Sequence, residues 1–371
     1  PPQVYPMFPW QTGKAVRDTG TRGTHMAEGR VTITDVAKLA GTSTATVSHY
    51  LNGKYSKMSG ATRERIKEAI GKMGYAPNAR ARDLANKRSE VVAVLIEDNT
   101  NAWAGRLVSG VEACAYENGY QTVVCDTHFD QQGERDYVEK MLSLGVDGFV
   151  VQPTNHYRAV NRRLRSAGKP VVFYDFNLLD LTSTWVKTDL YGGVYDAISE
   201  CAERGYEDFV LMTADVERMR TRSERYQGAV DALAERGIGC EQLQITHEGP
   251  PARELRRYLE QQLNPARRTL VFCAHQWALP RVFEALSDMR HLVPEQIGLL
   301  GLNNAEWAGL TTPSISTIVE PVEKEGRIAC SMLIDLMRDP NAPPQQKVLP
   351  CTTRWLASTL EPQEGQATGR T

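Results

Sequence analysis

The chain has 371 residues, of which 41% are hydrophobic and 24% charged, the composition of an ordinary globular protein. It contains 43 Lys and Arg against 45 Asp and Glu, and the net charge of −2 gives no sign of a polyanionic partner for the chain as a whole. The length predicts two or three domains. No apolar run approaches the roughly 18–20 residues that span a bilayer, and the N-terminus lacks the charged-then-apolar pattern of a signal peptide.

Charge is unevenly distributed along the chain. Residues 31–90 contain eleven Lys and Arg but five Asp and Glu, a net charge of +6, so the other residues sum to −8. A basic segment followed by an acidic body indicates that only the basic segment meets nucleic acid.

The seven cysteines are scattered singly along the sequence. An odd number without a C-x-x-C pair argues against a disulfide framework and against a zinc site. Cys125 and Cys273 lie in apolar runs and are most simply buried thiols. We therefore expect a reducing, cytoplasmic compartment, and we expect no metal and no other cofactor.

The first 30 residues are rich in Pro, Gly and Thr and have no helical or strand periodicity, so they are expected to form a disordered extension. Met26 stands just before the first ordered pattern and is a candidate natural start.

Residues 31–75 have the pattern of three short helices. Thr34 is predicted to cap the first helix, which Gly41 ends, and Ser43 is predicted to cap the second, from Thr44 to about Leu51. Two helices of about seven residues that are separated by Gly-Thr-Ser are typical of a helix-turn-helix.

The third helix is predicted from Ala61 to Met73, with Ser59 as its cap and Gly74 at its end. Residues 76–89 follow, where a Pro-Asn pair can start a short helix that is marginal alone in water. This segment is predicted to be a conditional hinge between a DNA-binding head and the body.

Residues 90–360 alternate short apolar strands with amphipathic helices, which predicts an α/β body of parallel sheets with helices on both faces. Eight strands are expected, at 91–96, 122–125, 148–152, 171–174, 209–213, 270–274, 297–302 and 316–319. The principal helices are expected at 107–118, 135–144, 195–204, 225–236, 252–263 and 322–337.

This length suits two lobes better than one sheet. The first lobe is expected at about 90–187 and 319–343, and the second at about 188–318 and 344–360. Residues 361–371 are expected to be a flexible tail. Ligands in such folds lie at the carboxyl ends of the strands, here in a cleft between the lobes.

Residues 31–89 read VTITDVAKLAGTSTATVSHYLNG and, after a short gap, MSGATRERIKEAIGKMGYAPNARARDLANKRS. This segment resembles the head of the LacI family of bacterial repressors. Looser matches follow in family order through the body, among them VVFYD, TDLYGG, ERYQGAVDAL and TTPSISTIVEP. The resemblance implies a periplasmic-binding-protein-like body of two parallel-sheet lobes.

The second helix of a helix-turn-helix places its N-terminal residues in the major groove. Thr44, Ala45 and His49 are the specificity positions that the resemblance implies. His49 departs from the Arg that is usual in the family, and histidine cannot make the bidentate contact of arginine to guanine. Small polar side chains suited to phosphate contacts are Thr32, Thr34, Ser43, Thr46, Ser48 and Asn52. The alternative is a basic three-helix surface with no role in a groove.

The hinge carries Leu84 among polar residues. The resemblance implies that this leucine and its copy in a second subunit wedge between base pairs at the operator centre, which bends the DNA. Asn78, Ala81 and Arg82 match the family's minor-groove contacts. The alternative is a leucine packed on the body.

The resemblance also implies an effector pocket, and here the sequence departs from the family's sugar-binding members. Two positions that commonly hold carboxylates are occupied by Gln276 and Asn303. Arg225 matches the family's ligand-clamping arginine. The full expected set is Trp103, Asp126, Asp175, Lys187, Asp189, Arg225, His275, Gln276 and Asn303. For each of these positions, a drifted pocket or a structural role is the alternative.

We expect a ligand-responsive transcriptional regulator, most simply a repressor that binds palindromic operator DNA as a homodimer. Thinned acids beside retained cations favour an effector with an anionic group, such as a sugar acid or sugar phosphate, with a neutral sugar or nucleobase as the rival. The other candidate functions are a small-molecule binding protein without a DNA role, and an enzyme on the same body. The absence of a nucleophile–base pair or metal set argues against an enzyme.

Overall fold

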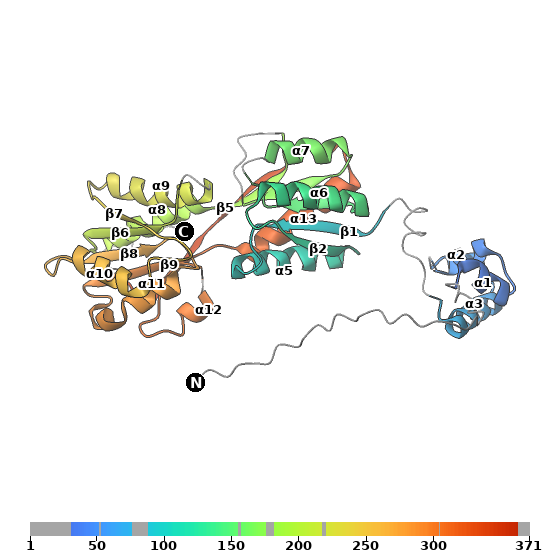
Figure 1. Ribbon diagram of the computed structural model, residues 1–371, viewed down its shortest axis with the longest axis horizontal. Coiled ribbons are helices and arrows are strands. Elements are labelled where there is room, and N and C mark those ends of the chain that lie inside the picture. Colours follow the sequence, from blue (N-terminus) through green and yellow to red (C-terminus); the bar gives the residue numbers. More distant parts are fainter. Residues whose placement is uncertain are drawn as a thin grey trace, which may run out of the picture. The chain divides into compact units, whose positions relative to one another are not determined.

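The computed structural model describes residues 31–51, 53–75, 88–154, 157–175, 182–216, 220–303 and 305–362. These residues form two compact units, a small helical head and a larger α/β body. Figure 1 shows both units and labels most of their helices and many of their strands.

The head consists of three helices around a small apolar core. They are α1 (Ile33–Leu39), α2 (Thr44–Leu51) and α3 (Gly60–Met73), with a 3₁₀ turn at Tyr55–Lys57 between the second and third. Val36, Val47 and Ile66, one from each helix, are completely buried against one another. The buried residues of each helix fix which side of that helix faces solvent.

The predicted cap of α1 is wrong by two residues. The amide of Asp35 donates to the hydroxyl of Thr32 and the Asp35 carboxylate accepts from the Thr32 amide, so Thr32 caps the helix and Thr34 lies within it. This reciprocal capping box satisfies two backbone donors where Thr34 could satisfy one. The predicted caps at Ser43 and Ser59 are confirmed, since each hydroxyl accepts from an amide three residues on.

The first lobe of the body is a six-stranded parallel sheet. Its strand order is β11 (Gln346–Pro350), β5 (Trp185–Asp189), β4 (Val171–Tyr174), β3 (Gly148–Val151), β1 (Val91–Ile96) and β2 (Gln121–Asp126). Helices α5 (Ala102–Glu117) and α13 (Val322–Arg338) cover one face, and α6 (Gln131–Leu144) and α7 (Tyr157–Ser166) cover the other. Successive residues of β1 alternate between these two cores, as the period of a strand requires.

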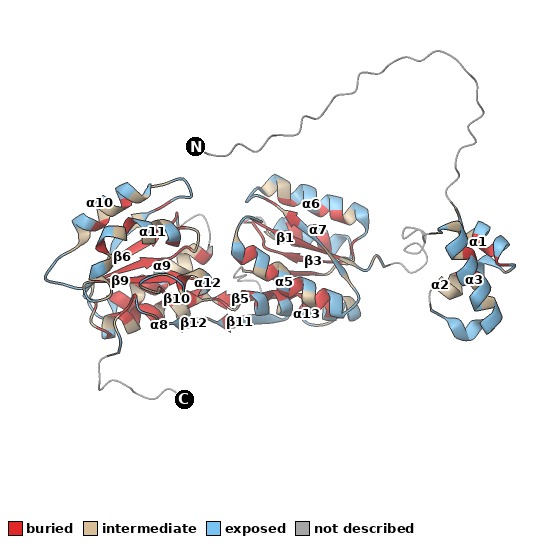
Figure 2. Ribbon diagram, turned by 90° about the horizontal axis from the view of Figure 1, so that it is seen from below, coloured by how far each residue is buried: buried red, intermediate tan, exposed pale blue. Residues whose placement is uncertain are grey.

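The second lobe repeats this arrangement. Its order is β12 (Thr352–Arg354), β10 (Ser316–Val319), β9 (Ile297–Leu302), β8 (Thr269–Cys273), β6 (Asp208–Thr213) and β7 (Glu241–Gln244), and β12 alone is antiparallel to its neighbour. Helices α8 (Leu190–Glu203) and α9 (Arg220–Ala234) pack on one face, and α10 (Ala252–Gln262) and α11 (Leu279–Ala285) pack on the other. The short α12 (Ala305–Ala308) and a 3₁₀ segment at Ser287–Leu292 complete the lobe. In both lobes the buried strands lie between helices whose outer sides are exposed (Figure 2).

The eight predicted strands are confirmed to within one residue at either end. Four strands escaped prediction, namely β5, β7, β11 and β12. Strands β7, β11 and β12 are mostly exposed and polar, so they lack the apolar run that identified the others.

The chain passes between the two sheets after β5, after β10 and between β11 and β12. The prediction that residues 344–350 belong to the second lobe is therefore wrong. Strand β11 pairs with β5 in the first sheet, with Val348 opposite Lys187. The polar β11 has its partner far away along the chain, which no local pattern reveals.

Helices α5 and α13, far apart in the sequence, lie side by side on the first sheet (Figure 1). Their backbones meet at two glycines. A Cβ on Gly110 would overlap the carbonyl oxygen of Glu323, and one on Gly326 would overlap that of Leu107. The absence of these two side chains sets the distance between the helices.

Gly110→Ala should lower the free energy of unfolding of the body by about 1–3 kcal/mol. The new methyl group would overlap the backbone of α13, which can move away only if the helix shifts. Gly105→Ala, in the same helix as Gly110, is the matched control, since a Cβ there has no neighbour within 4 Å. It should be neutral or stabilise by up to about 1 kcal/mol. Urea unfolding of the two variants measures both effects, and equal midpoints would contradict the close-contact explanation.

Candidate functional site

The first candidate site is the N-terminal end of α2 in the head. Ser43, Thr44 and Ala45 are exposed there, while Val47 is fully buried in the head core. His49, one turn after Ala45, is half-buried. Helix α2 therefore presents to solvent the small side chains that the sequence predicted for base contacts.

Several predicted phosphate contacts already have local partners. The hydroxyls of Ser43 and Thr46 lie 2.9 Å apart, and the hydroxyl of Thr32 donates to Asp35 at 2.7 Å. Thr34 is exposed and Ser48 is half-buried. Asn52 and the hinge residues Asn78, Ala81, Arg82 and Leu84 lie outside the described residues.

The head also exposes basic side chains beyond the C-terminal end of α2. Lys54 and Lys57 are exposed just after α2, and the guanidinium of Arg63 lies over the ring of Tyr55 at 4.0 Å. Such a stack holds the guanidinium at the surface without neutralising its charge. The head thus combines exposed cations with an exposed helix end.

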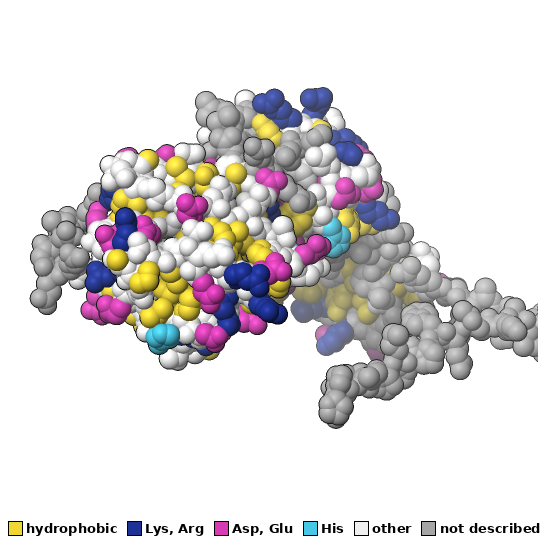
Figure 3. Space-filling model, turned by 60° about the vertical axis from the view of Figure 1, so that its left-hand side comes forward, with side chains coloured by type: hydrophobic (Ala, Val, Ile, Leu, Met, Phe, Trp, Pro, Cys, Tyr) yellow, Lys and Arg dark blue, Asp and Glu magenta, His cyan; other side chains and the backbone are white. Residues whose placement is uncertain are grey.

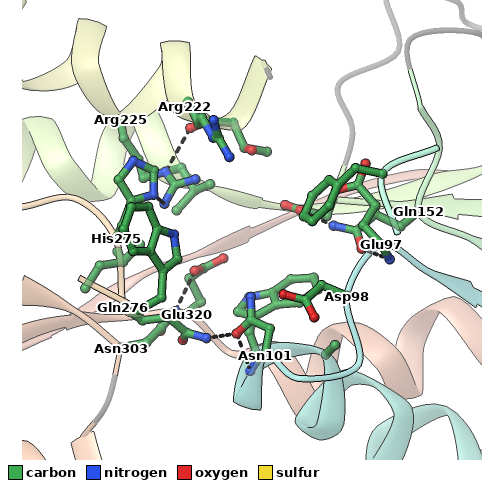
Figure 4. Close-up of a pocket in the computed structure, with 18 of the residues that line it drawn as sticks. Glu97, Asp98, Asn101, Gln152, Arg222, Arg225, His275, Gln276, Asn303 and Glu320 are labelled. Carbon is green, nitrogen blue, oxygen red and sulfur yellow. Dashed lines mark hydrogen bonds between the residues drawn. The ribbon is translucent and has the colours of Figure 1, made fainter. Parts of the chain in front are cut away.

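The second candidate site is a pocket between the two lobes of the body, at the carboxyl ends of both sheets (Figure 4). The first lobe contributes Glu97, Asp98, Asn101, Trp103, Gln152 and Asp175 to its lining. The second lobe contributes Arg222, Arg225, His247, His275, Gln276 and Trp277. Glu320, which directly follows β10 at a crossing between the lobes, also lines it.

The pocket is electrostatically polarised. Three carboxyl groups, those of Glu97, Asp98 and Asp175, come from the first lobe, whereas both arginines come from the second. In Figure 4 the labelled acids of the first lobe stand opposite Arg222 and Arg225. A bound molecule would therefore meet acceptors on one side and cationic donors on the other.

Arg225 is held by backbone contacts that leave its charge facing the pocket. Its Nε donates to the carbonyl oxygen of Thr221 at 3.0 Å, and its Nη1 donates to that of Ala274 at 2.7 Å. Burial lowers its pKa, an effect opposed by Glu320 and Asp175. Fixing a guanidinium in this way is a means of presenting it to a planar anion.

His275 lies beside this arginine as a neutral imidazole. Burial and the nearby guanidinium groups of Arg225 and Arg222 lower its pKa well below the ordinary value. The amide of Ala214 donates to Nε2 at 2.8 Å, so the ring hydrogen resides on Nδ1, which is 3.4 Å from Nη1 of Arg225. Two donors that face one another provide a place for an acceptor atom of a ligand.

A cluster of buried acids lies where the lobes join. Asp175 accepts from the side-chain amide of Gln152 at 2.9 Å, and its backbone amide donates to Glu325 at 3.1 Å. Burial, and then the charge of Glu320, raise the pKa of Asp175 to about 8. Burial also raises the pKa of Glu320 and of Glu325.

Asn303 reaches the pocket but is occupied by the chain itself. Its Nδ2 donates to the carboxylate of Glu320 at 2.7 Å, and its Oδ1 accepts from the Glu320 amide at 3.0 Å. The residue has a left-handed backbone, with φ of 55°, which asparagine tolerates better than most residues. Its main task in this structure is to orient Glu320.

Side-chain contacts between the lobes surround the pocket. Lys187 of β5 forms an ion pair with Glu224 of α9 at 2.6 Å, and Gln276 donates to Asn101 at the start of α5. These contacts hold the lobes at the separation that the structure shows.

Six of the nine predicted effector residues line the pocket, and three do not. The residues brought together are Trp103, Asp175, Arg225, His275, Gln276 and Asn303. Lys187 is instead paired with Glu224, Asp189 caps α8 by accepting from the Gly192 amide, and Asp126 accepts from the amides of Asn99 and His128.

The expectation that acids are thinned in the pocket is wrong. Glu97, Asp98 and Glu320 supply carboxyl groups from positions that the resemblance did not point to. A signal was present for two of them, since Glu97 and Asp98 directly follow β1 at the carboxyl end of the sheet. For Arg222 the signal was its position one helical turn before Arg225, on the same side of α9. His247 and Trp277, whose rings stack at 4.0 Å, belong to no motif that the sequence matched.

Among the described residues, no group of three His, Cys, Asp or Glu side chains could hold a metal ion. No helix in the described part of the chain is both long and apolar enough to cross a membrane.

Comparisons with known proteins match both units. Residues 32–78 match the profile of bacterial regulatory proteins of the lacI family, and residues 198–359 match that of a periplasmic binding protein-like domain. The chain is similar to the HTH-type transcriptional regulator PtxS of Pseudomonas aeruginosa, at 29% identity over 87% of this chain and 94% of that protein. It is also similar to the HTH-type transcriptional regulator KdgR of Bacillus subtilis, at 27% identity over 85% and 94%.

A similar fold is seen in the lac repressor dimer bound to operator and the anti-inducer ONPF. That structure aligns with a TM-score of 0.77 at 21% identity and covers 89% of this chain and 99% of that one. The fold class predicted from the sequence, a helix-turn-helix head with a two-lobed parallel-sheet body, is confirmed.

Asp175→Asn should make the protein more stable than the wild type above pH 8, because the buried carboxylate no longer has to be charged. An acid whose pKa is raised on folding holds its proton in the folded state alone between about pH 4 and pH 8, so stability falls as the pH rises through that window. The variant should lose this part of the slope and approach the wild type near pH 4. Urea unfolding from pH 4 to 9 measures it, with Asp98→Asn as the control for removing a pocket acid. An unchanged slope in Asp175→Asn would contradict the prediction.

Proposed function

The chain belongs to the LacI family of bacterial regulators, and from this we propose a repressor that binds a two-fold symmetric operator as a homodimer and responds to a small molecule held between its lobes. The relatives that it matches over most of their length are DNA-binding transcriptional regulators, and so is this chain. We assign residues 31–75 to DNA binding, 76–89 to the hinge and 90–360 to effector binding and dimerisation.

The observation that carries this proposal is the exposed N-terminal end of α2. Thr44 and Ala45 are exposed on the surface of the head, while Val47 of the same helix is buried in its core. Such an arrangement directs small side chains at base edges and leaves the exposed lysines elsewhere on the head for phosphates. The body, by contrast, shows Lys and Arg interspersed with Asp and Glu on the face in Figure 3.

A single short helix in one groove gives too little contact for typical specific affinity, which supports a dimer. The first lobe offers a suitable surface. Its edge strand β2 exposes Val123 and Val124, and Tyr116 at the end of α5 is 75% exposed. Apolar side chains on an unpaired edge strand are typical of a surface that another chain covers.

Selection of bound fragments from a random DNA library should return an inverted repeat for the wild-type protein. His49→Arg should shift the preferred half-site toward a guanine at one position, because arginine donates to O6 and N7 together, which gives ~1–3 kcal/mol of discrimination. Sequencing of the selected pools measures both outcomes.

The control for the selection is the same chain without residues 1–89, which should retain no fragment preference. Enrichment without a repeat would contradict the dimer. An identical consensus for both full-length proteins would mean that residue 49 does not read bases.

For the effector, we propose a polyhydroxylated small molecule with one anionic group, a sugar acid or sugar phosphate. The pair of donors at Arg225 and His275 supports the anionic end, and the acids of the first lobe are suited to accept from hydroxyls. The second candidate is a neutral sugar, which is favoured by the number of carboxyl groups in the pocket, those of Glu97, Asp98, Asp175 and Glu320.

Calorimetry with sugar acids and sugar phosphates, each beside its neutral parent sugar, decides between the two. An anionic member should bind, and Arg225→Ala should weaken it by about tenfold or more, since one charge-assisted contact is worth about that factor. Arg236→Ala, which removes a cation paired with Glu203 outside the pocket, is the control. Tight binding of a neutral sugar with silent anionic analogues would contradict the anionic effector and leave the DNA-binding function standing.

A further inference from the structure

A second cavity, of about 430 Å³, lies at the opposite end of the first sheet. Its lining comes from the segments that lead into β1, β3, β4, β5 and β11, together with the ends of α7 and α13. The strand segments lie at the amino ends of parallel strands, whereas the inter-lobe pocket lies at the carboxyl ends. Strands of four to six residues therefore separate the two cavities by roughly 13–20 Å.

The charge of this cavity is positive. Arg88, Arg165 and Lys169 line it, and none of them forms an ion pair with another residue in the described ranges. The one acid in the lining, Asp147, has its carboxylate occupied, since it accepts from the amides of Ser89 at 3.1 Å and of Glu90 at 2.8 Å. The three cations outnumber the single carboxylate of Asp147, and this excess of positive charge favours an anion.

The floor of the cavity offers polar atoms that are themselves buried. Asn161 and Ser183 are 9% and 5% exposed, and the Asn161 amide donates to the Ser183 hydroxyl at 2.9 Å. The serine accepts in this contact, so its own hydrogen remains to be donated. Arg165 donates one N–H to the carbonyl oxygen of Thr182 at 3.1 Å, which holds its guanidinium at the rim.

Another part of the lining is largely apolar. It consists of Leu336 and Met337 at the end of α13, Tyr120 before β2, and Pro340. A cavity of a few hundred Å³ with an apolar part and a few convergent polar groups is typical of small-molecule sites. The apolar part of the lining matches a flat or ring-shaped body, and the cations match one acidic group.

We propose that this cavity is a second ligand site, distinct from the inter-lobe pocket, for a small organic anion that carries a carboxylate or a phosphate on an apolar body. Arg88 is the first described residue of the body, so a ligand here would contact the point at which the described body begins. The site does not depend on the identity of the effector between the lobes.

Saturation-transfer NMR and calorimetry on the full chain, with phenyl phosphate and benzoate as probes, test the proposal and distinguish the two acidic groups. At least one probe should bind, while phenol, which lacks the charge, should not. Arg165→Ala combined with Lys169→Ala should weaken the bound probe by about tenfold or more. Arg162→Ala, which removes an exposed cation of the same helix outside the cavity, and Arg225→Ala in the other pocket should leave binding unchanged.

Failure of both probes to bind would overturn the proposal, as would equal binding by the double variant. Loss of binding in Arg225→Ala would place the probe between the lobes instead. If the double variant loses affinity for random DNA while its probe binding is unchanged, the cations serve DNA phosphates and the proposal is wrong. Thermal melting of the double variant checks that it is folded, which is expected because both side chains lie at the surface.

Discussion

The body depends on a single topological constraint, which is that the chain changes lobe three times and does so each time at the carboxyl end of a parallel strand. The chain leaves each lobe at the carboxyl end of β5, β10 or β11 and continues into the other lobe. The carboxyl ends of both sheets are thereby brought to face one another. The loops that follow the strands therefore line a shared cleft, and the polar side chains on those loops converge.

Convergence has an electrostatic cost in this cleft. Asp175, Glu320 and Glu325 are brought together at the joint between the lobes, and their burial raises the pKa of each. Arg225 is the cation that most offsets the pKa increase at Asp175. A ligand with a negative group near Arg225 and hydroxyl groups near the acids would offset the positive charge on one side of the pocket. It would also give the carboxyl groups on the other side hydrogen-bond donors.

Much of the fold could be predicted from the sequence, because the buried strands are continuous apolar runs and the head helices carry explicit caps. The third crossing could not, since β11 is polar and pairs with a strand far away in the sequence. At the site, Arg225 and His275 were found through their motifs. Glu97 and Asp98 belong to none of the matched motifs, and they and Glu320 follow strands other than those at which the motifs lack acids.

Both sheets have the same strand order, with the second strand of each lobe at the edge and the first, third, fourth and fifth following in turn. The cleft is therefore enclosed by two lobes that share one strand order. The side chains differ between the lobes, since Glu97, Asp98 and Asp175 belong to the first lobe and both arginines belong to the second. A ligand with two chemically different ends could lie in the cleft in either of two orientations. The strand order of the lobes does not distinguish these orientations, but their binding energies differ. The orientation of a bound ligand is thus set by a few side chains on two lobes that share one strand order.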